Sequence, residues 1–87
     1  MPAMPHQLRL NVYIRPYCHL CHELRAKLLP YQTQYGIEIN EIDIDTDTDL
    51  EARYGPYIPV LTGGDDAEIC HYFLDDAALT AYLTKIR

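Results

Sequence analysis

The sequence has few basic residues and no tryptophan, and both shortages narrow the range of functions. Seven Lys and Arg stand against thirteen Asp and Glu, which gives a formal net charge of −6 at pH 7. This balance argues against a nucleic-acid partner, because binding to phosphates needs a basic surface. The eight tyrosines have few basic neighbours, so they form no pattern for stacking on bases.

Long hydrophobic runs are also missing. No apolar segment approaches the roughly 20 residues that cross a bilayer. The first residues, MPAMPHQ, have neither the basic nor the apolar region of a signal peptide. The sequence therefore predicts a cytoplasmic protein without a membrane partner.

Cysteine is scarce, and the three that occur are unevenly placed. An odd number in a chain without an export signal is a poor disulfide framework, because cytosolic thiols stay mostly reduced. The cysteines are therefore expected to be reactive, metal-binding or buried. Cys18 and Cys21 lie three residues apart, whereas Cys70 is distant and is expected to pack as a small hydrophobic residue.

The 87 residues are enough for one hydrophobic core but not two. There are no repeats, low-complexity segments or linkers. We predict a flexible N-terminus over residues 1–7 and a single, monomeric domain over residues 8–87.

The first half of this domain predicts a strand, a helix and a second strand. Residues 8–14 alternate between apolar and polar, which is typical of a strand. From Cys18 to Tyr35 an apolar stripe at helical spacing predicts a helix, which Pro30 should kink or end and Gly36 should stop. Residues 37–44 predict a strand whose apolar phase slips, by a bulge or a late start.

The second half predicts a short helix, a hairpin and a final helix. The segment TDTDLEARYG offers Asp and Thr as helix caps, and its Asp spacing lacks the Gly and Glu of a calcium loop. YIPVLT and AEICHY flank a GGDD turn, and Asp75 is a candidate N-cap for the last helix. The order β-α-β-α-β-β-α, with a right-handed crossover, predicts an α/β sandwich: a mixed sheet with two long helices on one face and a short helix on the other.

The pair Cys18 and Cys21 lies where the first strand hands over to a helix. Free backbone N–H groups and the positive end of the helix dipole favour a thiolate at Cys18. Cys21, one turn further and beside the apolar stripe, should be more buried. An exposed attacking thiol and a sheltered resolving thiol suit thiol–disulfide exchange. Arg15 and His19 are candidates for further stabilising the thiolate.

The run YIRPYCHLCHEL, the element order and the later RYGPYIPVL resemble the thioredoxin fold and, more narrowly, the small glutaredoxin-like proteins of bacteria. The resemblance extends from Leu8 to Ile86. It implies a thioredoxin-like fold with a four-stranded mixed sheet and three helices. It also implies a thiol–disulfide oxidoreductase whose redox-active disulfide joins Cys18 to Cys21, with no bound cofactor.

The resemblance further implies substrate-binding residues. Pro59 matches a proline that is cis in the family, and the backbone of Ile58 would pair with substrate main chain. Arg15 matches a basic residue of the glutathione site, while Tyr17 and His19 border the first cysteine. The implied partners are a disulfide-containing protein or glutathione and an unidentified reductase.

Two departures from glutaredoxins concern glutathione. His19 and Leu20 stand where glutaredoxins typically carry Pro-Tyr between the cysteines. Tyr72 and Phe73 occupy the stretch where the family has a Gly-Gly before the last helix, and their bulk should hinder the approach of the glutathione backbone. Glutathione is therefore a candidate co-substrate only.

Three other interpretations use the same cysteines. Cys18, Cys21 and His22 spell the C-x-x-C-H haem-attachment motif, although that motif belongs to exported, mainly helical proteins. The same residues, with Cys70, provide ligands suited to zinc or an iron–sulfur cluster. A thioredoxin-fold binding module without turnover is the third interpretation.

Overall fold

The computed structural model describes residues 8–86, the last without its side chain, so the predicted flexible N-terminus lies outside the described residues. Two 3₁₀ turns, Ile44–Thr46 and Gly55–Tyr57, flank the second helix. The order of strands and α-helices confirms the predicted β-α-β-α-β-β-α pattern. The elements are β1 (Arg9–Ile14), α1 (His19–Tyr35), β2 (Glu38–Asp43), α2 (Thr48–Tyr54), β3 (Val60–Gly63), β4 (Glu68–His71) and α3 (Asp76–Ile86).

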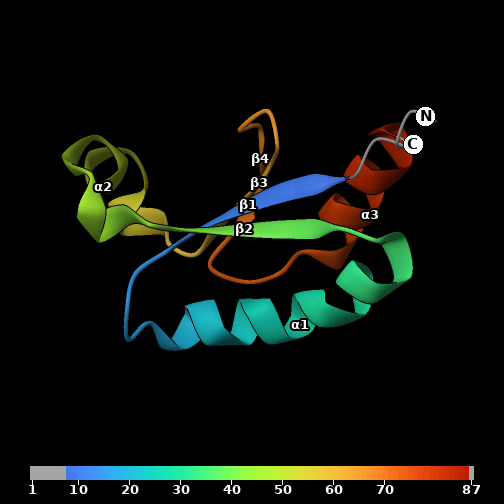
Figure 1. Cartoon of the computed structure of the whole chain (residues 1–87), viewed down its shortest axis with the longest axis horizontal. Helices are drawn as coiled ribbons and strands as arrows, with labels where there is room; N and C mark the ends of the chain where they lie inside the picture. The colour runs from blue at the N-terminus through green and yellow to red at the C-terminus, as the bar shows by residue number, and fades with distance from the viewer. Residues whose placement is uncertain (1–7, 87) are drawn as a thin grey trace, which may run out of the picture.

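The strands form one mixed sheet in the order β2-β1-β3-β4 (Figure 1). β1 and β2 are parallel, whereas β3 runs antiparallel to both β1 and β4. β1 and β4 therefore finish at the end of the sheet where β3 begins. We call this end, marked by Ile14, Val60 and His71, the thiol end, and the opposite end, with the β3–β4 turn, the hairpin end.

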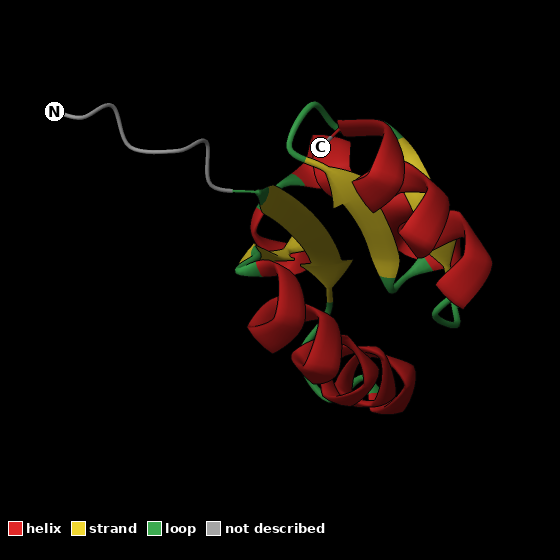
Figure 2. Cartoon of the chain, turned by 90° about the vertical axis from the view of Figure 1, so that its right-hand side faces the viewer, coloured by secondary structure: helices red, strands yellow, loops and turns green. Residues whose placement is uncertain are grey.

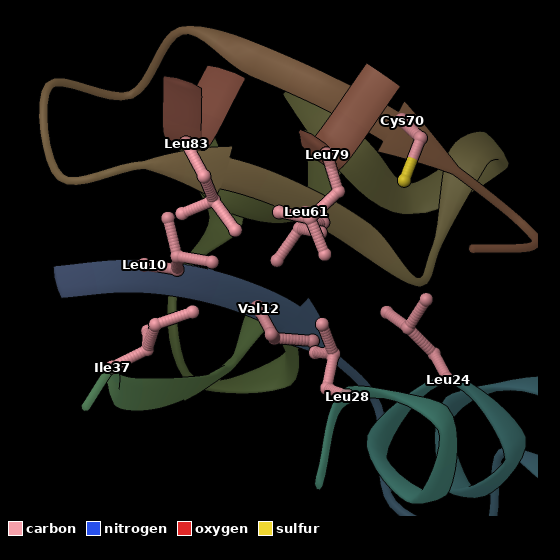
Figure 3. Close-up of a cluster of buried hydrophobic side chains, with 9 residues drawn as sticks. All are labelled: Leu10, Val12, Leu24, Leu28, Ile37, Leu61, Cys70, Leu79 and Leu83. Carbon is pink, nitrogen blue, oxygen red and sulfur yellow. The ribbon is translucent and has the colours of Figure 1, made fainter. Parts of the chain in front are cut away.

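The larger core lies on the face of the sheet covered by α1 and α3. Even-numbered residues of β1 point into this core, which the side-chain alternation of a strand predicts. Figures 2 and 3 show the two helices and the side chains that converge from them and from the sheet. The buried members are Leu10, Val12, Leu24, Leu28, Ile37, Leu61, Cys70, Leu79 and Leu83.

A smaller core lies on the opposite face, under α2, and it is partly aromatic. Its buried members are Tyr13, Ile44, Tyr54 and Val60, and the rings of Tyr13 and Tyr54 stack with centroids 4.1 Å apart. The two faces thus have the unequal cover that the sequence predicts, with the long helices on one side and the short helix on the other.

The apolar phase of the second strand slips because residues in and beside this strand pack into both cores. Ile37 and Ile39 pack with the larger cluster, whereas Ile42 and Ile44 pack with the smaller one. The pairing of β2 with β1 is regular along its whole length, so the bulge considered from the sequence is not in this strand. The irregularity in the sheet lies instead between Leu61 and Thr62 of β3.

The first helix continues through Pro30 to Tyr35, so the predicted end of its regular part at Pro30 is wrong. The proline lies on the exposed side of the helix. Gly36 stops the helix as predicted, with a left-handed φ of 66° and its N–H bonded to the carbonyl of Gln32. None of the helices within residues 8–86 is long and apolar enough to cross a membrane.

Candidate functional site

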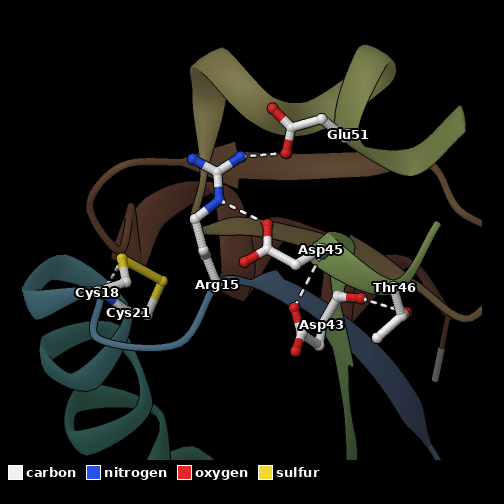
Figure 4. Close-up of polar contacts among 7 residues, drawn as sticks. All are labelled: Arg15, Cys18, Cys21, Asp43, Asp45, Thr46 and Glu51. Carbon is white, nitrogen blue, oxygen red and sulfur yellow. Dashed lines mark hydrogen bonds and ion pairs between the residues drawn. A yellow bond between two sulfur atoms is a disulfide. The ribbon is translucent and has the colours of Figure 1, made fainter. Parts of the chain in front are cut away.

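The cysteine pair sits at the junction between β1 and α1. A turn through Pro16 and Tyr17, the latter with a left-handed φ of 63°, delivers the chain to Cys18. Cys18 and Cys21 are joined by a disulfide, with their Cα atoms 5.2 Å apart (Figure 4). The strand-to-helix location expected from the sequence is therefore the observed one.

Cys18 is the N-cap residue of α1. Its backbone is extended, and its Sγ accepts a hydrogen bond from the N–H of Cys21 at 3.2 Å. Its carbonyl accepts the N–H of His22, also at 3.2 Å, which begins the helix. The first turn contains no acidic residue, so no carboxylate competes for the helix N-terminus.

The two sulfur atoms differ in access to solvent. Cys21 is 3% exposed and faces the core, whereas Cys18 is only partly buried. This difference confirms the asymmetry predicted for an outer and a sheltered cysteine. Of the two cysteines, Cys18 is therefore the more accessible from solvent.

Arg15 directs its guanidinium toward the turn and helix that follow β2, as Figure 4 shows. Its Nε donates to Asp45 at 3.0 Å, and its terminal nitrogen pairs with Glu51. The bond to Glu51 is the main cause that raises the pKa of Arg15 above its usual value; desolvation opposes it, and the bond to Asp45 adds a smaller increase. The positive charge of Arg15, which the sequence analysis expects to stabilise the Cys18 thiolate, is thus paired with two carboxylates.

The other residues predicted around Cys18 are exposed. Tyr17 is fully in solvent. His19 places Nε2 3.0 Å from a carboxylate oxygen of Glu23, one turn along α1. His22 is exposed on the same helix.

Ile58 and Pro59 precede β3 and lie at the thiol end of the sheet. Their peptide bond is cis, the isomer that the family resemblance implies. Pro59 is fully buried, and its carbonyl accepts the N–H of Tyr72 at 2.9 Å. Ile58 is half-buried and packs against the smaller core. The topology therefore brings this dipeptide to the same end as the cysteine pair.

Cys70 lies in β4 as a buried free thiol, 8% exposed, within the larger core. Burial raises the pKa of the Cys70 thiol above its ordinary value. These findings confirm the expectation that it packs as a small hydrophobic residue.

The acidic stretch after β2 caps helices. Asp43 accepts the N–H of Asp45, and Asp47 accepts the N–H groups of Asp49 and Leu50 at the start of α2. This confirms the capping role predicted for the stretch. Within the described part of the chain, no group of three or more His, Cys, Asp or Glu residues is placed to hold a metal ion.

The sequence analysis missed one surface. The rings of Tyr57, His71, Tyr72 and Phe73 contact one another in series beside Pro59. The sequence analysis treats Tyr72 and Phe73 only as obstacles to glutathione and assigns no role to His71. The only sequence signal was the run of three rings at residues 71–73, and its meeting with Tyr57 depends on the pairing of the strands.

Comparison with known proteins gives consistent results. Residues 9–84 match the family described as glutaredoxin-like domain (DUF836). A protein of Nitrosomonas europaea, solved by solution NMR, is 38% identical with a TM-score of 0.82, covering 94% of this chain and 98% of its own. A protein of X. campestris, solved by X-ray crystallography, is 33% identical with a TM-score of 0.66, covering 87% of this chain and 96% of its own.

A more distant likeness establishes the wider fold. Thioredoxin of Fasciola hepatica is 16% identical with a TM-score of 0.64, covering 93% of this chain and 82% of its own. No curated protein sequence matches the chain. The predicted thioredoxin-like fold and the glutaredoxin-like resemblance are both confirmed. The chain belongs to the glutaredoxin-like domain family (DUF836).

Proposed function

We propose that the protein is a thiol–disulfide oxidoreductase of the cytoplasm, acting as a monomer on protein or glutathione disulfides. The observation that carries the proposal is the position of Cys18. Its sulfur is the cap of α1 and accepts the N–H of Cys21, while Cys21 itself is buried. A thiolate at Cys18 would receive the same N–H bond and the helix dipole.

The first step forms a mixed disulfide. The Cys18 thiolate attacks one sulfur of the substrate disulfide, the substrate S–S bond breaks, and the other substrate sulfur leaves as a thiolate that takes a proton from water. The exposed side of Cys18 admits the substrate. Ile58, whose backbone precedes the buried Pro59, is proposed to align the substrate main chain, with Tyr17, His19 and Arg15 bordering the groove.

The second step releases the substrate. Cys21 gives its proton to water and attacks Cys18 Sγ, which forms the observed disulfide, breaks the mixed disulfide and expels the second substrate sulfur as a thiolate that takes a proton from water. Two electrons pass from the protein dithiol to the substrate, and two substrate thiols result. An unidentified reductase or thiol must then return two electrons to the pair. The proposed chemistry resides in the cysteines and needs no bound cofactor.

The test uses the Cys21→Ser variant, which retains the attacking thiol and lacks the resolving one. Mixed with a disulfide substrate, it should accumulate a mixed disulfide on Cys18, measured by intact mass and peptide mapping. The Cys18→Ser variant is the matched control and should form no adduct at that position. An adduct on Cys21 in the control, with full turnover, would overturn the assignment of the nucleophile.

The same preparation tests the alternative functions. A binding module without turnover would leave both variants and the native protein equally inactive toward every disulfide. A zinc or iron–sulfur site using Cys18 and Cys21 would show as stoichiometric metal in the purified native protein and its loss in both variants. Either result would contradict the oxidoreductase proposal.

A further inference from the structure

Four aromatic side chains form a continuous surface at the thiol end. Ring centroids are 5.6 Å apart for Tyr57 and His71, 4.7 Å for His71 and Tyr72, and 6.5 Å for Tyr72 and Phe73. Tyr57 is 48% exposed, Tyr72 38% and Phe73 62%. We call these four residues the aromatic cluster. Large exposed rings in contact with one another are typical of a binding surface rather than of scattered surface residues.

The aromatic cluster is attached to the segment that leads into β3. The N–H of Tyr72 donates to the carbonyl of Pro59 at 2.9 Å, and its hydroxyl donates to the carbonyl of Pro56 at 2.7 Å. Tyr57 directly precedes Ile58 in the chain. The rings therefore border the backbone proposed to align the substrate.

Tyr72 is held in an unfavourable backbone conformation. Its φ is 65°, in the left-handed region that favours glycine and that costs other residues about 1–2 kcal/mol. The backbone N–H bond to Pro59 fixes the chain at this residue, and the hydroxyl bond to Pro56 fixes the ring, despite this cost. A large ring kept where glycine would be easier indicates a functional requirement for the ring.

The charges around the aromatic cluster are acidic. An open hollow of ≈ 650 Å³ adjoins it, lined by His71 and Phe73 together with three acidic residues, Glu68, Asp75 and Asp76. Glu68 contacts His71, Asp75 caps α3, and Asp76 accepts the hydroxyl of Tyr31, so none of the three is paired with a lysine or arginine in these contacts. The cation nearest in sequence to the cysteine pair, Arg15, is already bound by two carboxylates. This arrangement disfavours the carboxylates of glutathione and favours a ligand with a basic side chain.

We propose that the aromatic cluster and the acidic hollow dock an extended polypeptide segment of the substrate. The segment would place an apolar side chain on the rings and a lysine or arginine in the hollow. The protein would thereby select polypeptide disulfides over glutathione disulfide. This inference rests on the proposed oxidoreductase function and names its substrate class.

The test compares reduction of two disulfides by the native protein. One is a peptide disulfide in which each cysteine is flanked by phenylalanine and lysine, and the other is glutathione disulfide. The kcat/KM for the peptide should exceed that for glutathione disulfide by at least about tenfold, which corresponds to about 1.4 kcal/mol. Replacing the lysine of the peptide by glutamate should remove most of this preference.

Substitutions then locate the surface. Phe73→Ala should lower the ratio of the two kcat/KM values about tenfold, a typical loss for an exposed aromatic contact. Tyr57→Ala is a second variant with the same expectation, in case one substitution disturbs folding. Leu29→Ala is the matched control, because Leu29 is similarly exposed, at 59%, and lies on α1 outside the cluster.

The outcomes separate this inference from the function on which it rests. Reduction of both disulfides with no preference, or a preference untouched by both aromatic variants, would overturn the docking surface and leave the oxidoreductase function standing. Failure to reduce either disulfide would overturn both. As a readout independent of turnover, the Cys18→Ser variant should bind the reduced peptide, and the added Phe73→Ala substitution should weaken that affinity about tenfold, measured by titration calorimetry.

Discussion

The two ends of the sheet differ in the residues that adopt a left-handed backbone and in what the side chains of those residues do. At the hairpin end, the turn carries Asp66, a short polar residue that tolerates its left-handed φ of 68°. Its carboxylate reaches back over the sheet and accepts bonds from Asn11 at 3.3 Å and from the hydroxyl of Tyr13 at 2.6 Å. These bonds add to the pairing of two largely buried polar side chains, of which Asn11 also donates to the carbonyl of Gly63.

At the thiol end, two bulky residues, Tyr17 and Tyr72, have the same backbone conformation, and their neighbours are exposed rings and a disulfide. Here the aromatic rings are exposed to solvent and Cys18 is partly exposed, instead of being buried. The contrast indicates that the hairpin end serves stability, whereas the thiol end serves chemistry and binding. Changes at the two ends should therefore affect different measurements.

The largest expected difference is between the thiol-end Cys18 and the core Cys70 in the reduced protein. Cys18 should react rapidly with iodoacetamide at neutral pH, because it is partly exposed and its sulfur accepts an N–H. Cys70 is buried and should react only when the fold opens. If that opening costs at least about 5 kcal/mol, the two rates differ more than about a thousandfold. Peptide mass mapping over time measures both, and comparable rates would contradict the structure.

The Asp66→Ala substitution breaks the hairpin end. It removes an acceptor of the Tyr13 hydroxyl and one of the two acceptors of the Asn11 amide, which should lower the free energy of unfolding by about 1–2 kcal/mol. Urea denaturation measures this loss. Asp66→Asn is the matched control, because its amide oxygen can accept both bonds, and it should be closer to the native stability.

Neither Asp66 variant should change the rate of disulfide exchange measured well below its denaturation midpoint. A loss of exchange activity greater than the loss of folded protein would contradict the separation of the two ends.

The Tyr72→Gly and Tyr72→Ala substitutions test whether the left-handed backbone of Tyr72, at the thiol end, is strained. Both remove the ring and its bond to Pro56, but only glycine is free of the penalty for the left-handed backbone. The glycine variant should therefore be more stable than the alanine variant by about 1 kcal/mol. Thermal and urea unfolding measure the difference. An alanine variant as stable as the glycine variant would show that Tyr72 is not under backbone strain.

The smallest effect concerns pH. Burial raises the pKa of Cys70 above its ordinary value of 9.0, so the unfolded chain ionises first as pH increases. The contribution of the neutral thiol to stability is therefore complete below pH 9 and is lost above it, by less than about 1 kcal/mol at about pH 9.5.

Urea unfolding of the oxidised protein, in which Cys18 and Cys21 do not titrate, isolates this contribution. Cys70→Ala is the matched variant and should show a flatter decline between about pH 8 and pH 9.5. An equal decline in both proteins would assign it to other groups. Tyr13 and Tyr82, whose pKa values burial also raises, should contribute only at more alkaline pH.

Local sequence patterns predicted the features that depend on residues close together in the chain. The alternation of residues 8–14 predicted β1, and Gly36 and Asp75 marked a helix end and a helix start that the structure confirms. The position of Cys18 and the burial of Cys21 also followed from the helix that they begin. These features depend on neighbours within about a turn of helix or strand.

The features that escaped prediction depend on distant partners. Arg15 meets Glu51, 36 residues away, and Tyr13 meets Asp66, 53 residues away, so no local pattern reports either contact. The aromatic cluster brings Tyr57, which precedes β3, beside His71 at the end of β4, because β4 pairs with β3. Such contacts are set by the sheet topology. The slipped phase of the second strand also depends on distant partners, because its isoleucines pack into cores on opposite faces of the sheet.

The central claim is that Cys18 and Cys21 form a reversible dithiol–disulfide couple. A redox titration of the purified protein in glutathione buffers, read by alkylation and intact mass, tests it most directly. We expect one two-electron transition confined to Cys18 and Cys21, with a midpoint in the range of about −270 to −120 mV that proteins of this fold cover. A pair that stays in one state across that range, or a transition that requires Cys70, would contradict the account.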